Sequence, residues 1–382
     1  MGVEEELLLV DPDTGDPRAV AAAVLRHDDA QGGSGPDGSS GPDRSTRREV
    51  GSGPGGTLEA ELKQEQIEVD TTPCDSLSDL RREVVQARRR AADAAGAVGM
   101  QVAALATSPM EGASHTTTNA RYQRMGDIFG ITEYEQLTCG CHVHVSIGSP
   151  EEGVAVLDRI RGWLPVLLAL SANSPFLQGR DTGYASFRSQ MVQRWPTAGP
   201  TEPFGDATTY RSTVDALVRS GAAMDPAMIY FDGRLSERYS TVEIRISDVC
   251  LDAENTILIA ALARGLVETA ARGWVDRSEP ANLRVDLLRA ASWRAARIGV
   301  RGDLLHPATL RTAPAATVVE ALLRHTEAAL GDAGDLEVVR DLARAVLERG
   351  NGAVRQRGVL SRSGLLADVV ADAVLHTAMR SD

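Results

Sequence analysis

Hydrophobic and polar residues alternate in four short segments of the chain, and this period of two predicts β-strands. The four segments are residues 2–10, 62–71, 137–147 and 240–247. Successive side chains of a strand point to opposite faces, so each segment would have one apolar face and one polar face. Two shorter apolar runs, at residues 101–106 and 228–231, predict further strands.

A period near 3.6 predicts helices in most of the remaining chain. One helix is expected to begin after Ser76, which forms a capping box with Asp79, and the three arginines at 88–90 are interpreted as its solvated face. Another begins near Pro150 and should kink at Pro165. The other predicted helices cover residues 208–219, 253–272, 284–298, 315–330, 335–349 and 361–379.

The order of these elements mixes strands with helices first and has helices alone at the end. This order predicts an α+β fold with a mostly antiparallel sheet, flanking helices and a helical C-terminal layer at about 252–382. Residues 31–56 are dense in Gly, Ser, Pro and Asp, which is typical of a mobile surface loop rather than a domain linker. We therefore expect one domain over residues 1–382.

The polar faces of the four strands carry groups that bind cations and anions. In chain order these groups are Glu4 with Glu6, then Gln66, Glu68 and Asp70, then His142 with His144, and finally Glu243 with Arg245. In one sheet, so many carboxylates would repel one another, and a divalent cation such as Mg²⁺ would relieve the repulsion. The alternative is a polar sheet face that simply meets water, and alternation alone leaves both interpretations open.

The charge balance of the chain excludes several classes of function. Forty basic residues against 53 acidic ones give a formal net charge of −13, which argues against nucleic acid as a partner. Lys63 is the only lysine, and no P-loop motif is present. If a nucleotide binds, arginines and a metal must therefore hold its phosphates.

The spacing of the cysteines and the length of the apolar runs indicate the cellular compartment. The four cysteines do not have the spacing of a disulfide scaffold or a zinc ribbon, and Cys139 and Cys141 fall on the apolar face of their strand. No apolar run approaches the roughly 20 residues needed to cross a bilayer, and no signal-peptide pattern opens the chain. These features predict a cytoplasmic protein without a membrane partner.

Several motifs, taken in order, resemble the glutamate–cysteine ligase type 2 (carboxylate–amine ligase) family. They are Gly-Val-Glu-Glu-Glu-Leu at 2–7, Cys-Gly-Cys-His-Val-His-Val at 139–145, Leu-Ser-Ala-Asn-Ser-Pro-Phe at 170–176, the run from Gly179 to Gly199, and Thr-Val-Glu-Ile-Arg at 241–245. The resemblance implies a catalytic sheet like that of glutamine synthetase. It also implies that ATP and Mg²⁺ activate the γ-carboxylate of glutamate as an acyl phosphate, which the amine of cysteine then attacks.

The resemblance also assigns roles to individual residues. It implies metal ligands at Glu4, Glu6, Glu61, Glu68, His142 and Glu243. It places His142 and His144 near the nucleotide, and it implies that Arg188 and Arg245 bind phosphate or substrate and act in catalysis. Glu61 is seven residues before Glu68, so a bulge or turn must intervene if both are to reach one site.

Two other functions fit the same motifs. One is the same chemistry on a different acid or amine, and the other is a non-catalytic sensor of ATP or metal. In each case the expected partners are small molecules, with a symmetric homo-oligomer expected by analogy.

Overall fold

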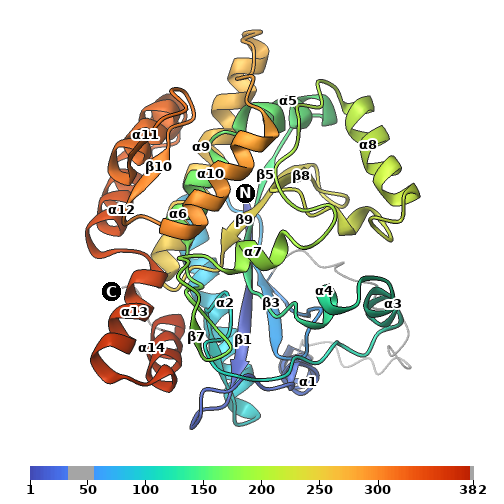
Figure 1. The fold of residues 1–382 in the computed structure, drawn as a ribbon, viewed down its shortest axis with the longest axis vertical. Coiled ribbons are helices and arrows are strands. Elements are labelled where there is room, and N and C mark those ends of the chain that lie inside the picture. The colour runs from blue at the N-terminus through green and yellow to red at the C-terminus, as the bar shows by residue number, and fades with distance from the viewer. Residues whose placement is uncertain (33–55, 379–382) are drawn as a thin grey trace.

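The computed structural model describes residues 1–32 and 56–378, and seven strands among them form one antiparallel sheet (Figure 1). The order is β2-β3-β1-β5-β9-β8, and β4 also pairs with β1 beside β5. The strands are β1 (Gly2–Val10), β2 (Leu58–Ala60), β3 (Gln66–Asp70), β4 (Gln101–Ala103), β5 (Gly140–Ser146), β8 (Gly233–Leu235) and β9 (Thr241–Asp248). The predicted α+β fold with a mostly antiparallel sheet is confirmed.

The register of the sheet aligns the polar positions of neighbouring strands. Glu4 lies opposite Asp70 on β3 and opposite His142 on β5. Glu6 lies opposite Glu68, and His144 lies opposite Glu243 on β9. Because directly opposed residues of antiparallel strands point to the same face, these side chains share one face of the sheet.

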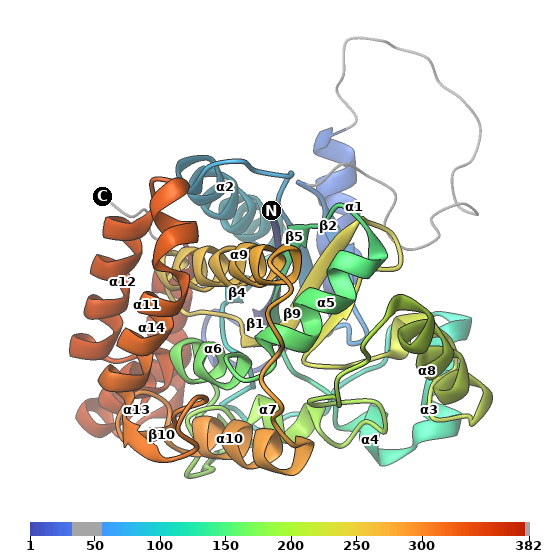
Figure 2. The ribbon, with the colours of Figure 1, turned by 90° about the horizontal axis from the view of Figure 1, so that it is seen from above.

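Three helices cover the other, apolar face of the sheet. They are α2 (Leu77–Ala97), α5 (Pro150–Ile160) and α9 (Ala253–Val275), and Figure 2 shows α2 and α9 side by side. The strand residues Val143 and Ile244 are fully buried in one core cluster with side chains of these helices. The predicted capping of α2 is confirmed, since the Ser76 hydroxyl accepts a hydrogen bond from the Asp79 N–H.

A buried ion pair joins the apolar face of β1 to α2. Glu5 is 2% exposed and Arg88 is 1% exposed, and the guanidinium donates Nε and Nη2 to the carboxylate at 2.7 Å each. Arg88 also donates to the carbonyls of Cys250 and Leu251, and the Thr256 hydroxyl donates to Glu5. The interpretation of residues 88–90 as a solvated face was therefore wrong for Arg88, because it is the counter-charge of a buried carboxylate.

The remaining C-terminal helices form a layer on one side of the molecule (Figure 1). They are α11 (Ala315–Asp332), α12 (Leu336–Arg349), α13 (Gly352–Ser363) and α14 (Leu366–Ala378), while α10 (Val285–Ile298) packs against α6 (Leu164–Ser171). The single helix predicted at 361–379 is wrong, because Gly364 has a φ of 74° and ends α13 in the left-handed conformation.

Three other element predictions were also inaccurate. The predicted strand at 228–231 is replaced by the 3-10 helix η1 (Pro226–Met228), followed by an isolated bridge between Phe231 and Gly199. These apolar side chains are buried without joining the ladder. The strand predicted from residue 62 begins only at Gln66. The helix predicted to kink at Pro165 is broken before it, and Pro165 lies in the first turn of α6.

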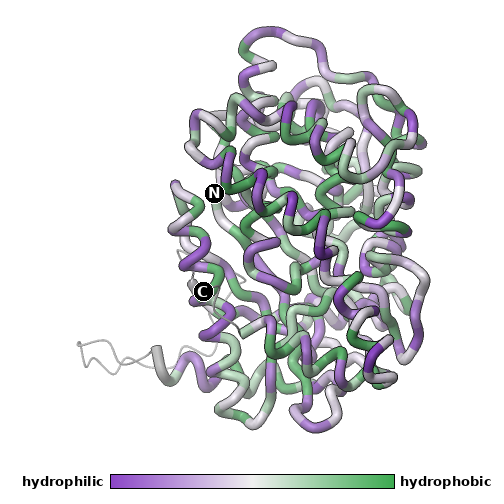
Figure 3. The backbone as a smooth tube through the Cα atoms, turned by 90° about the vertical axis from the view of Figure 1, so that its left-hand side faces the viewer, coloured by the Kyte–Doolittle hydropathy of each residue, from purple (hydrophilic) through white to green (hydrophobic). Residues whose placement is uncertain are grey.

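The remaining helices and strands lie outside the main sheet. They are α1 (Ala21–Gly32), α3 (Ala120–Phe129), α4 (Ile131–Tyr134), β6 (Phe176–Leu177), β7 (Arg180–Asp181), α7 (Arg188–Val192), α8 (Ala207–Arg219), β10 (Asp303–Leu305) and β11 (Thr312–Pro314). The predicted loop at 31–56 lies outside the described residues except for its two ends. Hydrophobic and hydrophilic residues are interspersed along the backbone (Figure 3). No described helix is long and apolar enough to cross a membrane.

Candidate active site

Two adjoining cavities lie on the polar face of the sheet. The larger has a volume of about 370 Å³ and is lined by polar residues of β1, β3, β5 and β9 and by residues of α3. The smaller has a volume of about 120 Å³ and extends towards α7. The two cavities share a wall of six residues, which are Glu6, Glu61, Leu62, His142, Tyr230 and Arg245.

Two groups of side chains in the larger cavity are close enough to hold a metal ion. Glu4, His142 and Glu243 form one group, and Glu6, Glu68 and His142 form the other. In each group the ligand atoms lie within 4.8 Å of one another. The Nε2 atom of His142 is buried and has no hydrogen-bond partner among the described residues. Carboxylate oxygens with one imidazole are a donor set that suits a divalent cation such as Mg²⁺.

Glu4 lies between the two imidazoles of β5. Its Oε2 lies 3.3 Å from His142 Nδ1, and its Oε1 lies 3.1 Å from His144 Nε2. Burial would raise the pKa of Glu4, but hydrogen bonds to the two histidines outweigh burial and hold that pKa well below its usual range. Burial and the nearby Arg245 lower the pKa of His142 to about 4, which keeps its ring neutral and able to bind a metal.

The carboxylates on the other side of His142 repel one another. Burial raises the pKa of Glu68 well above its usual value, and the charges of Glu4, Glu61 and Glu6 add to this effect. Burial and the charge of Glu6 raise the pKa of Glu61 to about 6. Burial also raises the pKa of Glu6, although the Gly140 N–H donates to its Oε2 at 2.6 Å. A bound cation would stabilise the charged forms of all three carboxylates.

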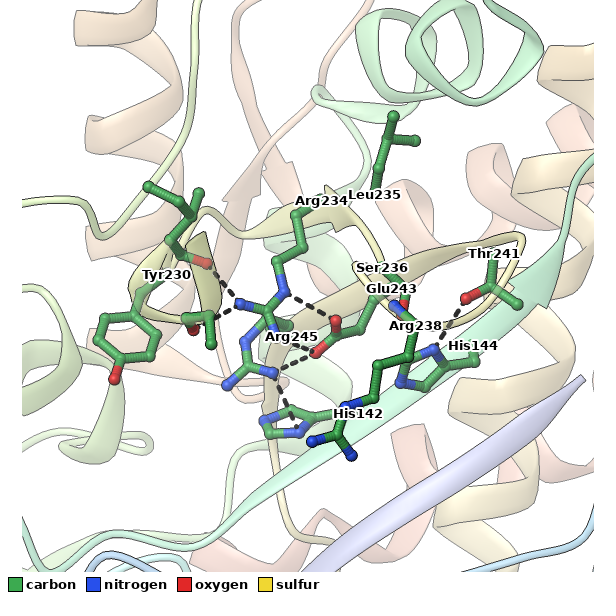
Figure 4. Close-up of polar contacts among 12 residues, drawn as sticks. His142, His144, Tyr230, Arg234, Leu235, Ser236, Arg238, Thr241, Glu243 and Arg245 are labelled. Carbon is green, nitrogen blue, oxygen red and sulfur yellow. Dashed lines mark hydrogen bonds and ion pairs between the residues drawn. The ribbon is translucent and has the colours of Figure 1, made fainter. Parts of the chain in front are cut away.

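Two arginines, Arg234 and Arg245, form ion pairs with Glu243 on β9 (Figure 4). Arg234 donates Nε and Nη2 to the Glu243 carboxylate at 2.7 and 3.2 Å, and Arg245 forms a second ion pair with it. These cations outweigh the effect of burial and lower the pKa of Glu243. Arg245 Nη1 also lies 3.4 Å from His142 Nδ1, so one guanidinium contacts both an acidic and an imidazole group.

Arg188 lies on the wall of the smaller cavity at the start of α7. Its side chain is buried, and its Nε has no hydrogen-bond partner among the described residues. Gly140 allows this placement, because a Cβ at that position would collide with the guanidinium of Arg188. The unpartnered Nε and the open cavity leave Arg188 able to bind an anionic group.

The turn between β2 and β3 brings Glu61 into the site. A bulge or turn was expected here, so that Glu61 and Glu68 could both reach one site. Lys63 in this turn is fully buried and donates to Glu133 Oε1 at 2.7 Å and to Thr116 Oγ1 at 3.0 Å. The Thr117 N–H donates to the Leu62 carbonyl. The only lysine of the chain is therefore a structural anchor of the turn and does not line either cavity.

The structure brings every predicted site residue to the walls of these two cavities. Sequence reasoning missed Arg234, because β8 is only three residues long and shows no alternation. It also missed Glu59 on β2, beside the Gly-rich segment. Arg121 lines the larger cavity while paired with Asp225, and Trp195 lines the smaller one with 4% of its surface exposed.

Comparisons with known proteins agree on one family. A family model described as "Glutamate-cysteine ligase family 2 (GCS2)" matches residues 1–374. A Streptomyces coelicolor protein named as a candidate glutamate–cysteine ligase 2 is 50% identical over 380 residues, covering 99% of this chain and 98% of that protein. A Streptomyces avermitilis protein, named as a candidate glutamate–cysteine ligase 2-1, is 50% identical over 377 residues, covering 99% of each chain.

Solved structures with low sequence identity share the fold. The glutamate–cysteine ligase of Francisella tularensis in complex with AMP aligns with a TM-score of 0.66 and 11% identity, over 100% of this chain and 89% of that one. A bifunctional glutathione synthetase from Pasteurella multocida aligns with a TM-score of 0.64 and 15% identity, over 99% of this chain and 52% of that one.

Proposed function

The chain belongs to glutamate–cysteine ligase family 2, and we propose that it uses Mg-ATP to join the γ-carboxylate of L-glutamate to the amine of L-cysteine. The products would be γ-glutamylcysteine, ADP and phosphate, with an acyl phosphate as the intermediate. The observation that carries this proposal is the convergence of carboxylates, imidazoles and arginines from β1, β3, β5 and β9 on one pair of cavities.

The acidic residues of the larger cavity would hold the metal. We assign this role to Glu4, Glu6, Glu61, Glu68, His142 and Glu243, whose mutual repulsion and unpartnered imidazole nitrogen suit a cation. When bound, Mg²⁺ supplies charge neutralisation for the phosphate oxygens. His144, whose Nε2 lies 3.1 Å from Glu4 Oε1, would hold Glu4 in place, and we assign it with His142 to the nucleotide site.

The arginines would orient the reacting groups. Phosphoryl transfer depends mainly on positioning and on neutralising charge, so no covalent nucleophile is required. Arg245 lies on the wall common to both cavities, where it can bind a phosphate oxygen during transfer. Arg188, in the smaller cavity, can bind the carboxylate or acyl phosphate of glutamate through its guanidinium.

The test is ADP release by the purified protein with Mg-ATP and glutamate, with and without cysteine. We expect ADP release that depends on cysteine, together with γ-glutamylcysteine detected by mass spectrometry. Glu243→Gln should reduce the rate by about 100-fold or more, because it removes a charge that holds the metal and Arg245. Glu151→Gln is the matched control, since Glu151 is exposed at the start of α5, away from both cavities.

The outcomes separate the alternatives. ADP release with another amine but not with cysteine would keep the ligase chemistry and change the substrate. ATP binding without turnover on any amine or acid would contradict the ligase proposal and support a sensor of ATP or metal.

A further inference from the structure

Asp232 is a carboxylate in the smaller cavity that the proposed metal and phosphate contacts do not use. It lies between Phe231 and the first residue of β8, and it lines the cavity together with Arg188. Its main chain is fixed on both sides, since its N–H donates to the Gly199 carbonyl at 3.0 Å and its carbonyl accepts from the Arg245 N–H at 2.9 Å. Its carboxylate forms no hydrogen bond or ion pair with a side chain among the described residues, so it is open to a ligand.

The position of Asp232 relative to the metal groups is defined by the shared wall of the two cavities. Glu6, Glu61, His142 and Arg245 border both cavities, whereas Asp232 borders only the smaller of the two. A glutamyl group activated at this wall would therefore expose its carbonyl carbon to a cavity that contains Asp232. The attacking amine would reach that carbon from the Asp232 side of the smaller cavity, which Glu4, Glu68 and Glu243 do not line.

An amine needs a base before it can attack. The amine of an amino acid is mainly protonated at neutral pH, and a protonated amine has no lone pair. A carboxylate that has no other partner and lines the acceptor cavity is suited to remove that proton. Resting on the proposed ligase function, we infer that Asp232 is the general base that deprotonates the attacking amine, and that the part of the smaller cavity beside Asp232 is the amine site.

The proposed step conserves atoms and electrons. The ammonium group gives one proton to the Asp232 carboxylate, and the resulting lone pair forms the C–N bond at the acyl carbon. The C–O bond to phosphate then breaks, and phosphate leaves with the bonding electrons. The second proton of the nitrogen leaves with the departing phosphate, so the product is a neutral amide.

The electrostatic surroundings of Asp232 suit this role. Burial raises its pKa to about 7, although the positive charges of Arg188 on α7 and Arg289 on α10 oppose the rise. A base with a pKa near the working pH combines ready proton acceptance with a large unprotonated fraction. Besides Arg188, the other charged or titratable groups lining this cavity are Glu6, Glu61, His142, Tyr230 and Arg245.

The decisive experiment compares two acyl acceptors, cysteine and hydroxylamine. Hydroxylamine is neutral at pH 7 and attacks acyl phosphates without a base, giving a hydroxamate that is measured by its iron complex. Asp232→Asn should lower kcat with cysteine by about 100-fold or more, within the range typical of a general base. With hydroxylamine, the same variant should stay within about threefold of the original protein. Asp215→Asn, at an exposed position of α8, is the matched control and should change neither rate.

A second measurement needs no variant. In the original protein, Asp232 accepts a proton only above its pKa, so the cysteine-dependent kcat should rise as pH passes through about 7 and then level off. The hydroxylamine rate should lack this rise.

Equal losses with both acceptors, no loss with either, or matching pH profiles would overturn the assignment of Asp232. Absence of activity with both acceptors in the original protein would instead overturn the ligase function on which the assignment rests.

Discussion

Strand β1 carries three consecutive glutamates, Glu4, Glu5 and Glu6. The two faces of the strand differ in the groups that surround these carboxylates. Glu5 points into the apolar core, where Arg88 and Thr256 hold both of its oxygens. Glu4 and Glu6 point to the cavity, where Glu68 and Glu61 add negative charge and the pKa values of Glu6, Glu61 and Glu68 are raised. The comparison separates Glu5, whose charge is compensated within the fold, from Glu6, Glu61 and Glu68, whose charges destabilise the fold until a cation binds.

The largest expected effect comes from breaking the structural pair. Arg88→Met would leave the charge of Glu5 buried without a counter-charge, which typically costs about 3–5 kcal/mol of unfolding free energy. Denaturant unfolding followed by circular dichroism measures the loss. The double variant Glu5→Leu with Arg88→Met should recover most of it, since an apolar replacement removes the stranded charge. A loss below about 1 kcal/mol in the single variant would contradict the role of this pair.

A smaller effect is expected on the ligand-binding face. Mg²⁺ at a hundred times its Kd should stabilise the protein by about 2.7 kcal/mol, since it binds only the folded state. Glu68→Gln should remove most of this gain, yet leave the metal-free protein as stable as before or more so, because one repelling charge is gone. Melting temperatures with Mg²⁺ and with EDTA test both points. Equal responses to Mg²⁺ in the variant and in the original protein would exclude Glu68 as a ligand.

The smallest effect on stability is expected for a second Arg–Glu ion pair of α2, which lies at the protein surface. Arg81 on α2 also pairs with a glutamate through two hydrogen bonds, donating to Glu254 at 2.7 and 2.8 Å, but its side chain is 34% exposed. Arg81→Met should therefore cost no more than about 1 kcal/mol in the same unfolding experiment. If it cost as much as Arg88→Met, burial would not explain the difference between the two pairs.

The alternation of strands allowed much of the site to be predicted. The period of two is fixed by backbone geometry, so Glu4 with Glu6, or Glu243 with Arg245, had to share a face wherever a strand formed. The same reasoning could have found the Arg88 pair. Glu5 alternates with the core residues Val3 and Leu7, and Arg88 continues the buried stripe of Leu80 and Val84.

The parts that could not be predicted depend on contacts distant in sequence. Arg234 contacts Glu243 from β8, a strand of three residues. Such a short strand is recognised only through its pairing with β9 in the folded protein. Asp232 is held by a main-chain hydrogen bond to Gly199 and lines a cavity that α7 and α10 complete. The apolar residues before it suggested a strand, because burial of a short segment does not reveal whether its backbone joins a ladder.

The four buried cysteines have a consequence for redox chemistry. All four thiols are free and buried, and burial raises the pKa of each above its usual value. Thiol–disulfide exchange requires an accessible thiolate, so these side chains react slowly with small disulfides. A protein proposed to bind cysteine would meet cystine whenever its substrate is oxidised. Its own thiols would then stay unmodified, and its activity would depend on the oxidation state of the substrate alone.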